Sequence, residues 1–188
     1  MSGMPVAEPM TARRFLALGV PEGGRPWNLV GGEVVLSEPT PLHQEVQGNL
    51  LFALESWARA TSQRGRVSLP RDVVLDESNV FAPDILWYRE GRVPDVHAAP
   101  PSPMPDLAVE IRSASNWRYD LGAKKPGYER LGLPELWLVD TSRRTVLVYR
   151  RSGPDGAVYD PAEELGGSDE LTSPQLAGFA VRVDLLFP

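Results

Sequence analysis

The sequence contains no cysteine, so disulfide bonds and thiolate metal sites are excluded. Histidine is also scarce, because His43 and His97 are the only two. A metal ion would therefore be held by oxygen atoms or by these two side chains. This tilts the choice of metal toward a hard cation such as Mg²⁺ or Mn²⁺.

Long apolar runs are missing as well. No stretch approaches the ~20 apolar residues that a helix needs to cross a bilayer, and the first residues lack the apolar segment of a signal peptide. We therefore expect a soluble, cytoplasmic protein without a membrane partner. The 188 residues suit one domain with its own core, and 42% hydrophobic and 23% charged residues are ordinary globular values.

Positive charge is in short supply overall, since the formal net charge is −6. This value argues mildly against a protein that binds nucleic acid constitutively. The charge is uneven, however. Residues 110–151 hold nine Lys and Arg against five Asp and Glu, whereas residues 155–188 hold one against seven. A local positive field can matter more to a phosphate ligand than the total charge does.

The pattern of apolar residues predicts one long helix and several strands. Residues 41–64 carry apolar side chains at helical spacing, and Thr40 followed by Pro41 is typical of a helix start. A shorter helix is expected at residues 11–19 and another in the second half of residues 117–132. Strands are predicted in the valine-rich or alternating runs LVGGEVVLS, VSLPRDVVLD, VFAPDILWYRE, PDLAVEIRS, ELWLVD, TVLVYR and FAVRVDLLF.

The order of these elements predicts the fold class. Helices and strands in this order form an α/β (α+β) domain with a mixed central sheet flanked by helices. We divide the chain into an N-terminal extension with a short helix, residues 1–27, and the main domain, residues 28–188. The acidic stretch at residues 153–175 is expected to form a hairpin with loops.

Two acids stand out because they lie inside apolar strands. Asp84 occurs in FAPDILWY and Glu110 in LAVEIRS. A lone carboxylate is costly to bury, and two that come together repel and raise one another's pKa. A divalent cation between them removes this conflict, so we favour a metal site. The alternatives are acids that face water from an edge strand, or two independent salt bridges.

Basic residues follow the second acid. Lys124 lies at the start of the helix after the Glu110 strand, where its ammonium could orient an attacking water or neutralise the transition state of phosphate transfer. The alternative is a solvated lysine. Arg112 lies two residues after Glu110, on the same face of the strand. It could contact the scissile phosphate or simply pair with Glu110.

The order of these residues resembles a known superfamily. Pro83-Asp84, then Glu110 in an apolar strand, then a lysine, resemble the PD-(D/E)xK nucleases. The strings GGEVVLSEPTPLHQEV, FAPDILW, LAVEIRSAS and DLGAKKPGYERLGLPELWLVD further resemble the bacterial restriction endonuclease family of the Uma-two type, from about residue 28 to about residue 186. The resemblance implies a restriction-endonuclease-like mixed sheet between helices, dependence on Mg²⁺ or Mn²⁺, and hydrolysis of phosphodiester bonds in DNA.

The same resemblance implies roles for individual residues. Asp84 and Glu110 would bind the metal ion, and the backbone carbonyl of Ile111 would complete its shell. Lys124 would be the catalytic lysine, carried on the helix rather than two residues after the acid.

The sequence departs from the superfamily pattern in two places. Arg112 stands where a lysine usually follows the acid, and arginine cannot act as a base near neutral pH. Pro126 stands in the helix that carries Lys124, and proline is tolerated only in a first turn. We therefore expect this helix to begin near Lys124, with Asp120 interpreted as an N-cap.

Four further residues are secondary candidates. Glu33 could reach the metal through water, or lie at the surface beside the Gly-Gly turn. His43 could face the sheet from the long helix, or bond a backbone carbonyl. Glu45 belongs by default to the solvated face. Tyr128 shares a helix face with Lys124 and could hold the lysine in place or only pack.

The sequence leaves two functions open. One is a metal-dependent endodeoxyribonuclease, in which the metal and Lys124 activate a water that attacks the phosphate. The other is a catalytically inactive module that keeps the nuclease fold for binding or assembly. We also expect a homo-oligomer, a dimer or a tetramer, because ELWLV and LLFP offer apolar surface.

Overall fold

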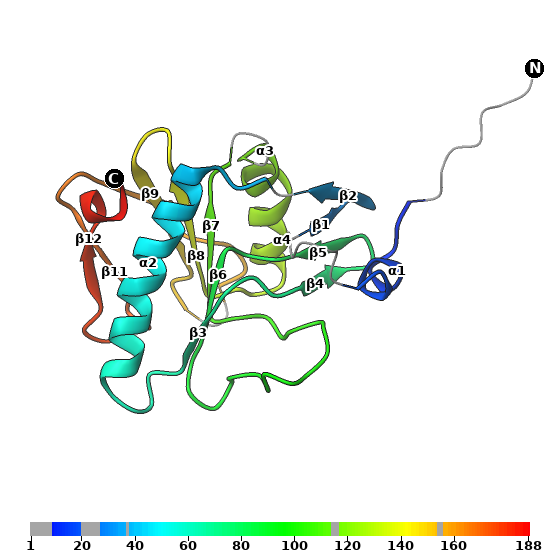
Figure 1. Cartoon of the computed structure of the whole chain (residues 1–188), viewed down its shortest axis with the longest axis horizontal. Helices are drawn as coiled ribbons and strands as arrows, with labels where there is room; N and C mark the ends of the chain where they lie inside the picture. Colours follow the sequence, from blue (N-terminus) through cyan, green and yellow to red (C-terminus); the bar gives the residue numbers. More distant parts are fainter. Residues whose placement is uncertain (1–8, 20–26, 37, 114–116, 154–155) are drawn as a thin grey trace, which may run out of the picture.

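The computed structural model describes residues 9–19, 27–36, 38–113, 117–153 and 156–188. Figure 1 shows helix α2 on one side of the central strands and the helical segment α3 to α4 on the other. The elements follow one another as α1 (Ala12–Ala17), β1 (Trp27–Val30), β2 (Glu33–Leu36), α2 (Pro41–Ala60), β3 (Arg66–Ser68), β4 (Val73–Asp76), β5 (Asn79–Phe81), β6 (Ile85–Tyr88), β7 (Leu107–Ile111), α3 (Trp117–Tyr119), the π-helix η1 (Asp120–Lys124), α4 (Lys125–Arg130), β8 (Glu135–Asp140), β9 (Thr145–Arg150), β10 (Glu163–Gly166), β11 (Glu170–Thr172), β12 (Ala180–Arg182) and the 3₁₀-helix η2 (Val183–Leu186).

Two sheets contain most of the described strands. The larger is a six-stranded mixed sheet in the order β10-β9-β8-β7-β6-β3, in which β7 and β8 run parallel and the other neighbours run antiparallel. The smaller is antiparallel, in the order β2-β1-β5-β4. The predicted mixed central sheet between helices is confirmed.

Strands β7 and β8 form the centre of the molecule. Every residue of both strands is buried, as expected for strands covered on both faces. Parallel neighbours need a crossover connection, and the segment from α3 to α4 supplies it. ELWLV lies inside β8, so the prediction that it offers apolar surface for assembly is wrong. In LLFP, Leu185 is 64% exposed but the next two residues are buried; a homo-oligomer stays a prediction.

Helix α2 packs on one face of the six-stranded sheet. The side-chain oxygen of Thr40 accepts a hydrogen bond from the His43 N–H and caps the helix, as its sequence predicts. The apolar stripe of Val46, Leu50 and Leu54 is fully buried against the core. The helix ends at Ala60, earlier than predicted.

The acidic stretch does not form the predicted hairpin. Strand β10 pairs with β9, whereas β11 pairs with β12. The physical reason is the burial of one leucine in each strand. Leu165 of β10 enters the core cluster beside β9, and Leu171 of β11 enters it beside β12. The burial of these two leucines therefore sets the pairing of β10 and β11, and the two strands do not pair with each other.

The predicted short N-terminal helix is confirmed as α1. Phe15 is buried with Leu29 and Val80 of the four-stranded sheet. The division of the chain at residue 27 stays a prediction. None of the described helices combines the length and the apolar character needed to cross a membrane.

A substitution at Gly65 tests how closely the turn after α2 packs on strand β6. A Cβ at Gly65 would lie 2.0 Å from the Tyr88 carbonyl oxygen, whereas a Cβ at Gly91 would meet no atom within 4 Å; both residues have a positive φ. Gly91→Ala should cost about 1–2 kcal/mol of unfolding free energy for the left-handed backbone. Gly65→Ala should cost about 1–3 kcal/mol more because of the clash. Urea denaturation measures both, and equal losses would contradict the close approach.

Candidate active site

The pairing of β6 with β7 brings the two predicted acids together. Asp84 lies one residue before β6 and not inside a strand as expected. The strands are antiparallel with Ile85 opposite Val109, so continuing the register by one residue sets Asp84 opposite Glu110. Opposite residues of an antiparallel pair lie on the same face of the sheet. Both acids are buried, Asp84 with 9% and Glu110 with 2% of its surface exposed.

Asp84 is held from two directions. Its Oδ2 accepts a hydrogen bond from the Ile111 backbone N–H at 2.7 Å, and its Oδ1 lies 3.2 Å from Nε2 of His43. Its backbone carbonyl accepts from the side-chain amide of Gln47 at 2.8 Å. His43 and Gln47 are one turn apart on α2, so this helix sets the position of Asp84. His43 thus bonds a carboxylate, not the backbone carbonyl that the sequence left as an alternative.

Glu110 is held by the helical segment from α3 to α4. Its Oε2 accepts a hydrogen bond from the Lys124 ammonium at 2.6 Å, and its Oε1 accepts from the Tyr128 hydroxyl at 2.8 Å. The Lys124 ammonium also lies 3.0 Å from Oδ1 of Asp120. Lys124 is therefore not a solvated lysine, and Tyr128 holds the glutamate rather than the lysine.

A π-helical turn places these groups. The Lys125 N–H donates to the Asp120 carbonyl, five residues back, and Pro126 occupies the first turn of α4. The expected start of this helix near Lys124 is wrong: α4 begins at Lys125, but it continues helical backbone that already begins upstream in α3 and η1. Such π-turns are rare and occur often at functional sites.

Asp120 lies in the candidate site, where the sequence had predicted an N-cap. It is a buried acid at the start of the π-turn, with its carboxylate on the Lys124 ammonium, rather than an N-cap. The signal was present in the spacing, because Asp120, Lys124 and Tyr128 recur every four residues. Residues at this spacing share one face of a helical segment.

The remaining candidates lie outside this cluster. Arg112 does not pair with Glu110; its guanidinium donates to Asp140 at 2.8 Å. Glu33 is exposed at the start of the edge strand β2, and Glu45 is exposed on α2. No contact described in the structure joins either glutamate to the buried acids.

Burial and charge shift the pKa values in the cluster. Burial, with the charges of Asp120 and Asp84, raises the pKa of Glu110 to about 8 against the opposing ammonium of Lys124. Burial also raises the pKa of Asp120. Burial alone would lower the pKa of Lys124, but the neighbouring acids outweigh it and raise that pKa above its ordinary value. Lys124 is therefore a charged donor, not a base.

The cluster suits a divalent cation in charge and in donor type. Glu110 and Asp120 contact the Lys124 ammonium, and the charge of Asp84 also acts on it, so two negative charges are uncompensated when all four groups are ionised. Their oxygens are the ligands that Mg²⁺ and Mn²⁺ prefer. Nδ1 of His43 is buried and has no hydrogen-bond partner. Among the described residues, no three His, Asp or Glu side chains converge closely enough to hold a metal by themselves.

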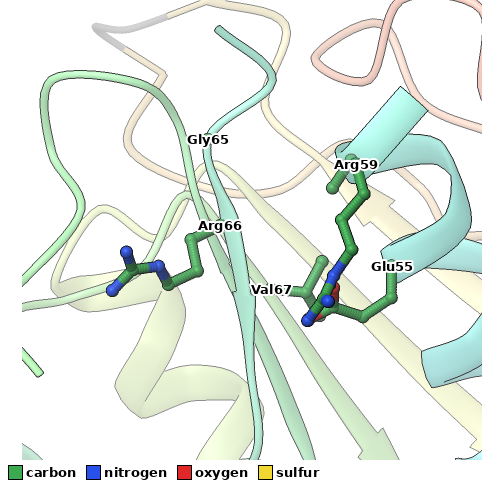
Figure 2. Close-up of a pocket in the computed structure, with 6 residues that line it drawn as sticks. Glu55, Arg59, Gly65, Arg66 and Val67 are labelled. Carbon is green, nitrogen blue, oxygen red and sulfur yellow. The ribbon is translucent and has the colours of Figure 1, made fainter. Parts of the chain in front are cut away.

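Two surface hollows lie away from the cluster. Figure 2 shows the first, about 330 Å³, between the end of α2 and strand β3, with Glu55, Arg59 and Arg66 around it. The second, about 320 Å³, lies beside Trp57 and Trp87. Both adjoin the end of β6 that is remote from Asp84, so we assign neither to the chemistry of the acids.

Comparisons with known proteins bear on the family and the fold. A family model described as "Putative restriction endonuclease" (Uma2) matches residues 13–184. A solved structure from Anabaena variabilis, described as a "putative nuclease belonging to DUF820", has a TM-score of 0.75 and 20% sequence identity. The match covers 95% of this chain and 98% of that chain, and at this identity it shows the fold alone. No curated protein matches the sequence.

The raised pKa of Glu110 predicts a specific pH dependence of stability. Between the ordinary glutamate pKa of 4.5 and the raised pKa of about 8, the folded state holds the Glu110 proton more tightly than the unfolded state does. The contribution of this group to stability is therefore complete below the lower value and is lost as the pH rises through the higher one. Glu110→Gln has no proton to lose in this range.

The melting temperature of Glu110→Gln minus that of the natural protein should therefore rise from about pH 5 to about pH 8.5. Differential scanning fluorimetry in EDTA measures this difference. Glu45→Gln, at an exposed position of α2, is the matched control and should give a flat difference. A flat difference for Glu110→Gln as well would contradict the buried, proton-holding glutamate.

Proposed function

Because the chain belongs to the Uma2 family, described as putative restriction endonucleases, we propose that it is a metal-dependent endodeoxyribonuclease that hydrolyses phosphodiester bonds in DNA. The observation that carries the proposal is a buried cluster in which Glu110 and Asp120 contact the Lys124 ammonium. The charge of Asp84 acts on both Glu110 and Lys124. Perturbed acids beside a buried lysine are typical of functional sites.

The acids would form the metal site. Asp84 and Glu110 offer carboxylate oxygens, and the backbone carbonyl of Ile111 is the third donor in the proposal. The Ile111 N–H already donates to Asp84, which places the Ile111 backbone beside that carboxylate. A bound Mg²⁺ or Mn²⁺ would supply a more acidic water and neutralise charge on the phosphate.

The basic residues would bind the reacting phosphate. The raised pKa of Lys124 keeps it an ammonium, so it orients a water or a phosphate oxygen by donating hydrogen bonds. Asp120 holds this ammonium from the far side, and Tyr128 holds the second oxygen of Glu110. Arg112 keeps N–H donors beyond the one on Asp140 and would contact the phosphate from the rim.

One observation favours the inactive module as the second candidate. The Lys124 ammonium already satisfies Glu110 at 2.6 Å, as a structural ion pair would, and Arg112 at the usual lysine position is bound to Asp140. In this alternative the fold binds DNA or assembles without cleaving it.

Metal binding is the first test. Asp84→Asn keeps the size of the side chain but removes a charged ligand, so the affinity for Mn²⁺ in calorimetry should fall by at least about 10- to 100-fold, the loss seen even for residues that only support a ligand. Glu45→Gln removes an exposed acid from α2 and should leave the affinity unchanged. Equal Mn²⁺ affinity in Asp84→Asn and the natural protein would rule out this metal site.

DNA cleavage is the second test. The natural protein should cleave single-stranded, duplex or supercoiled DNA with Mg²⁺ or Mn²⁺, and Lys124→Met should lower the rate by about 10²- to 10³-fold, because a buried donor to the transition state is lost. Lys125→Met changes the neighbouring, partly exposed lysine and should have little effect. Binding of DNA without cleavage of any form would favour the inactive module.

A further inference from the structure

Trp117 is a partly exposed tryptophan at the outer end of the acid cluster. It precedes Asp120 by three residues and Lys124 by seven in one continuous helical segment, and residues at this spacing lie on one side. Lys124 is buried and Trp117 is not. The helical segment therefore extends from the buried acids at Lys124 to the protein surface at Trp117. Three other tryptophans are buried in the core: Trp57, Trp87 and Trp137.

Arg112, which follows strand β7, lies beside the Trp117 ring. It lies two residues beyond Glu110, and its guanidinium is 5.4 Å from the centre of the Trp117 ring. Its position is well defined, because its backbone N–H donates to the Val139 carbonyl at 2.9 Å and its side chain donates to Asp140 at 2.8 Å. Arg112 and Trp117, which we call the rim pair, therefore lie together just outside the buried acids.

The chemistry of the rim pair matches that of a nucleotide. A guanidinium has five N–H donors, and the ion pair with Asp140 leaves several of them for a phosphate. An indole face stacks on a nucleobase, and single-strand-binding proteins use aromatic and arginine side chains together in this way. A base inside a duplex has both faces covered by its neighbours, so an aromatic side chain reaches only an unpaired or extruded base.

We propose that Trp117 stacks on an unpaired base while Arg112 binds the adjoining phosphate, so that the preferred substrate is DNA with an unpaired nucleotide beside the cleaved bond. This inference rests on the proposed nuclease function, which it deepens by naming the substrate class. It goes beyond the buried acids because it assigns binding to two residues that contact none of them.

A purely structural role for Trp117 makes a different prediction. The ring packs in part against the core cluster that includes Tyr128 and Leu138. If packing were its only role, Trp117→Leu would change the affinity for every DNA equally, through stability alone. The stacking role instead predicts a loss confined to DNA that presents an unpaired base.

The experiment compares three duplexes of one sequence: fully paired, with a single-nucleotide bulge, and with the same bulge lacking its base. Binding is measured by fluorescence anisotropy with Ca²⁺ in place of Mg²⁺. The natural protein should bind the bulged duplex about 5- to 150-fold more tightly than the abasic one, since stacking on one base contributes about 1–3 kcal/mol. Trp117→Leu should bring this ratio to about one, and Trp117→Phe should retain part of it.

The control is Trp27→Leu, which makes the same change at a partly exposed tryptophan that packs against the cluster of Phe15 and Leu29 and should keep the ratio. A ratio near one in the natural protein, or an unchanged ratio in Trp117→Leu, overturns the stacking role. Cleavage of the same duplexes with Mg²⁺ is scored separately. If the natural protein cleaves DNA but binds the bulged and abasic duplexes equally, this inference alone is overturned. If it prefers the bulged duplex but cleaves no DNA, the nuclease proposal is overturned and the stacking role is supported.

Discussion

The candidate site depends on one buried interaction. The Lys124 ammonium lies between the carboxylates of Glu110 and Asp120 and contacts both. Carboxylates that share a buried space disfavour their own charged form, through lost hydration and mutual repulsion. The ammonium relieves this for two acids through short, charge-assisted contacts. Asp84 lies close enough to raise the pKa of Glu110 further. The negative charge that remains when these acids are ionised is the physical basis for proposing a cation at this place.

The site joins two elements that pack on opposite faces of one sheet. From α2, His43 and Gln47 hold Asp84, whereas the crossover segment holds Glu110 through Lys124. The antiparallel register of β6 and β7 brings the two halves together. The stability of the sheet and the geometry of the acids are therefore linked, because a shift of either helical element moves one carboxylate relative to the other.

The clearest failure of sequence reasoning concerns Asp120. An aspartate near the expected start of a helix is typical of an N-cap, and Pro126 favoured a late start. The chain instead forms helical backbone from Trp117 and widens it into a π-turn, so Asp120 points into the protein. Local propensity does not anticipate a π-turn, because its hydrogen bond spans five residues. Arg112 shows the same limit, since its partner Asp140 lies on the parallel neighbour strand.

By itself, the sequence determined the strand that carries Glu110, the strand that follows Asp84, the long helix and the mixed sheet, because apolar periodicity follows from backbone geometry over a few residues. Only the tertiary structure decided that Lys124 neutralises Glu110, that His43 bonds Asp84 and that Arg112 turns to Asp140. Ion-pair partners depend on distance and burial between groups far apart in the chain. The packing of whole elements sets both, and no local pattern encodes them.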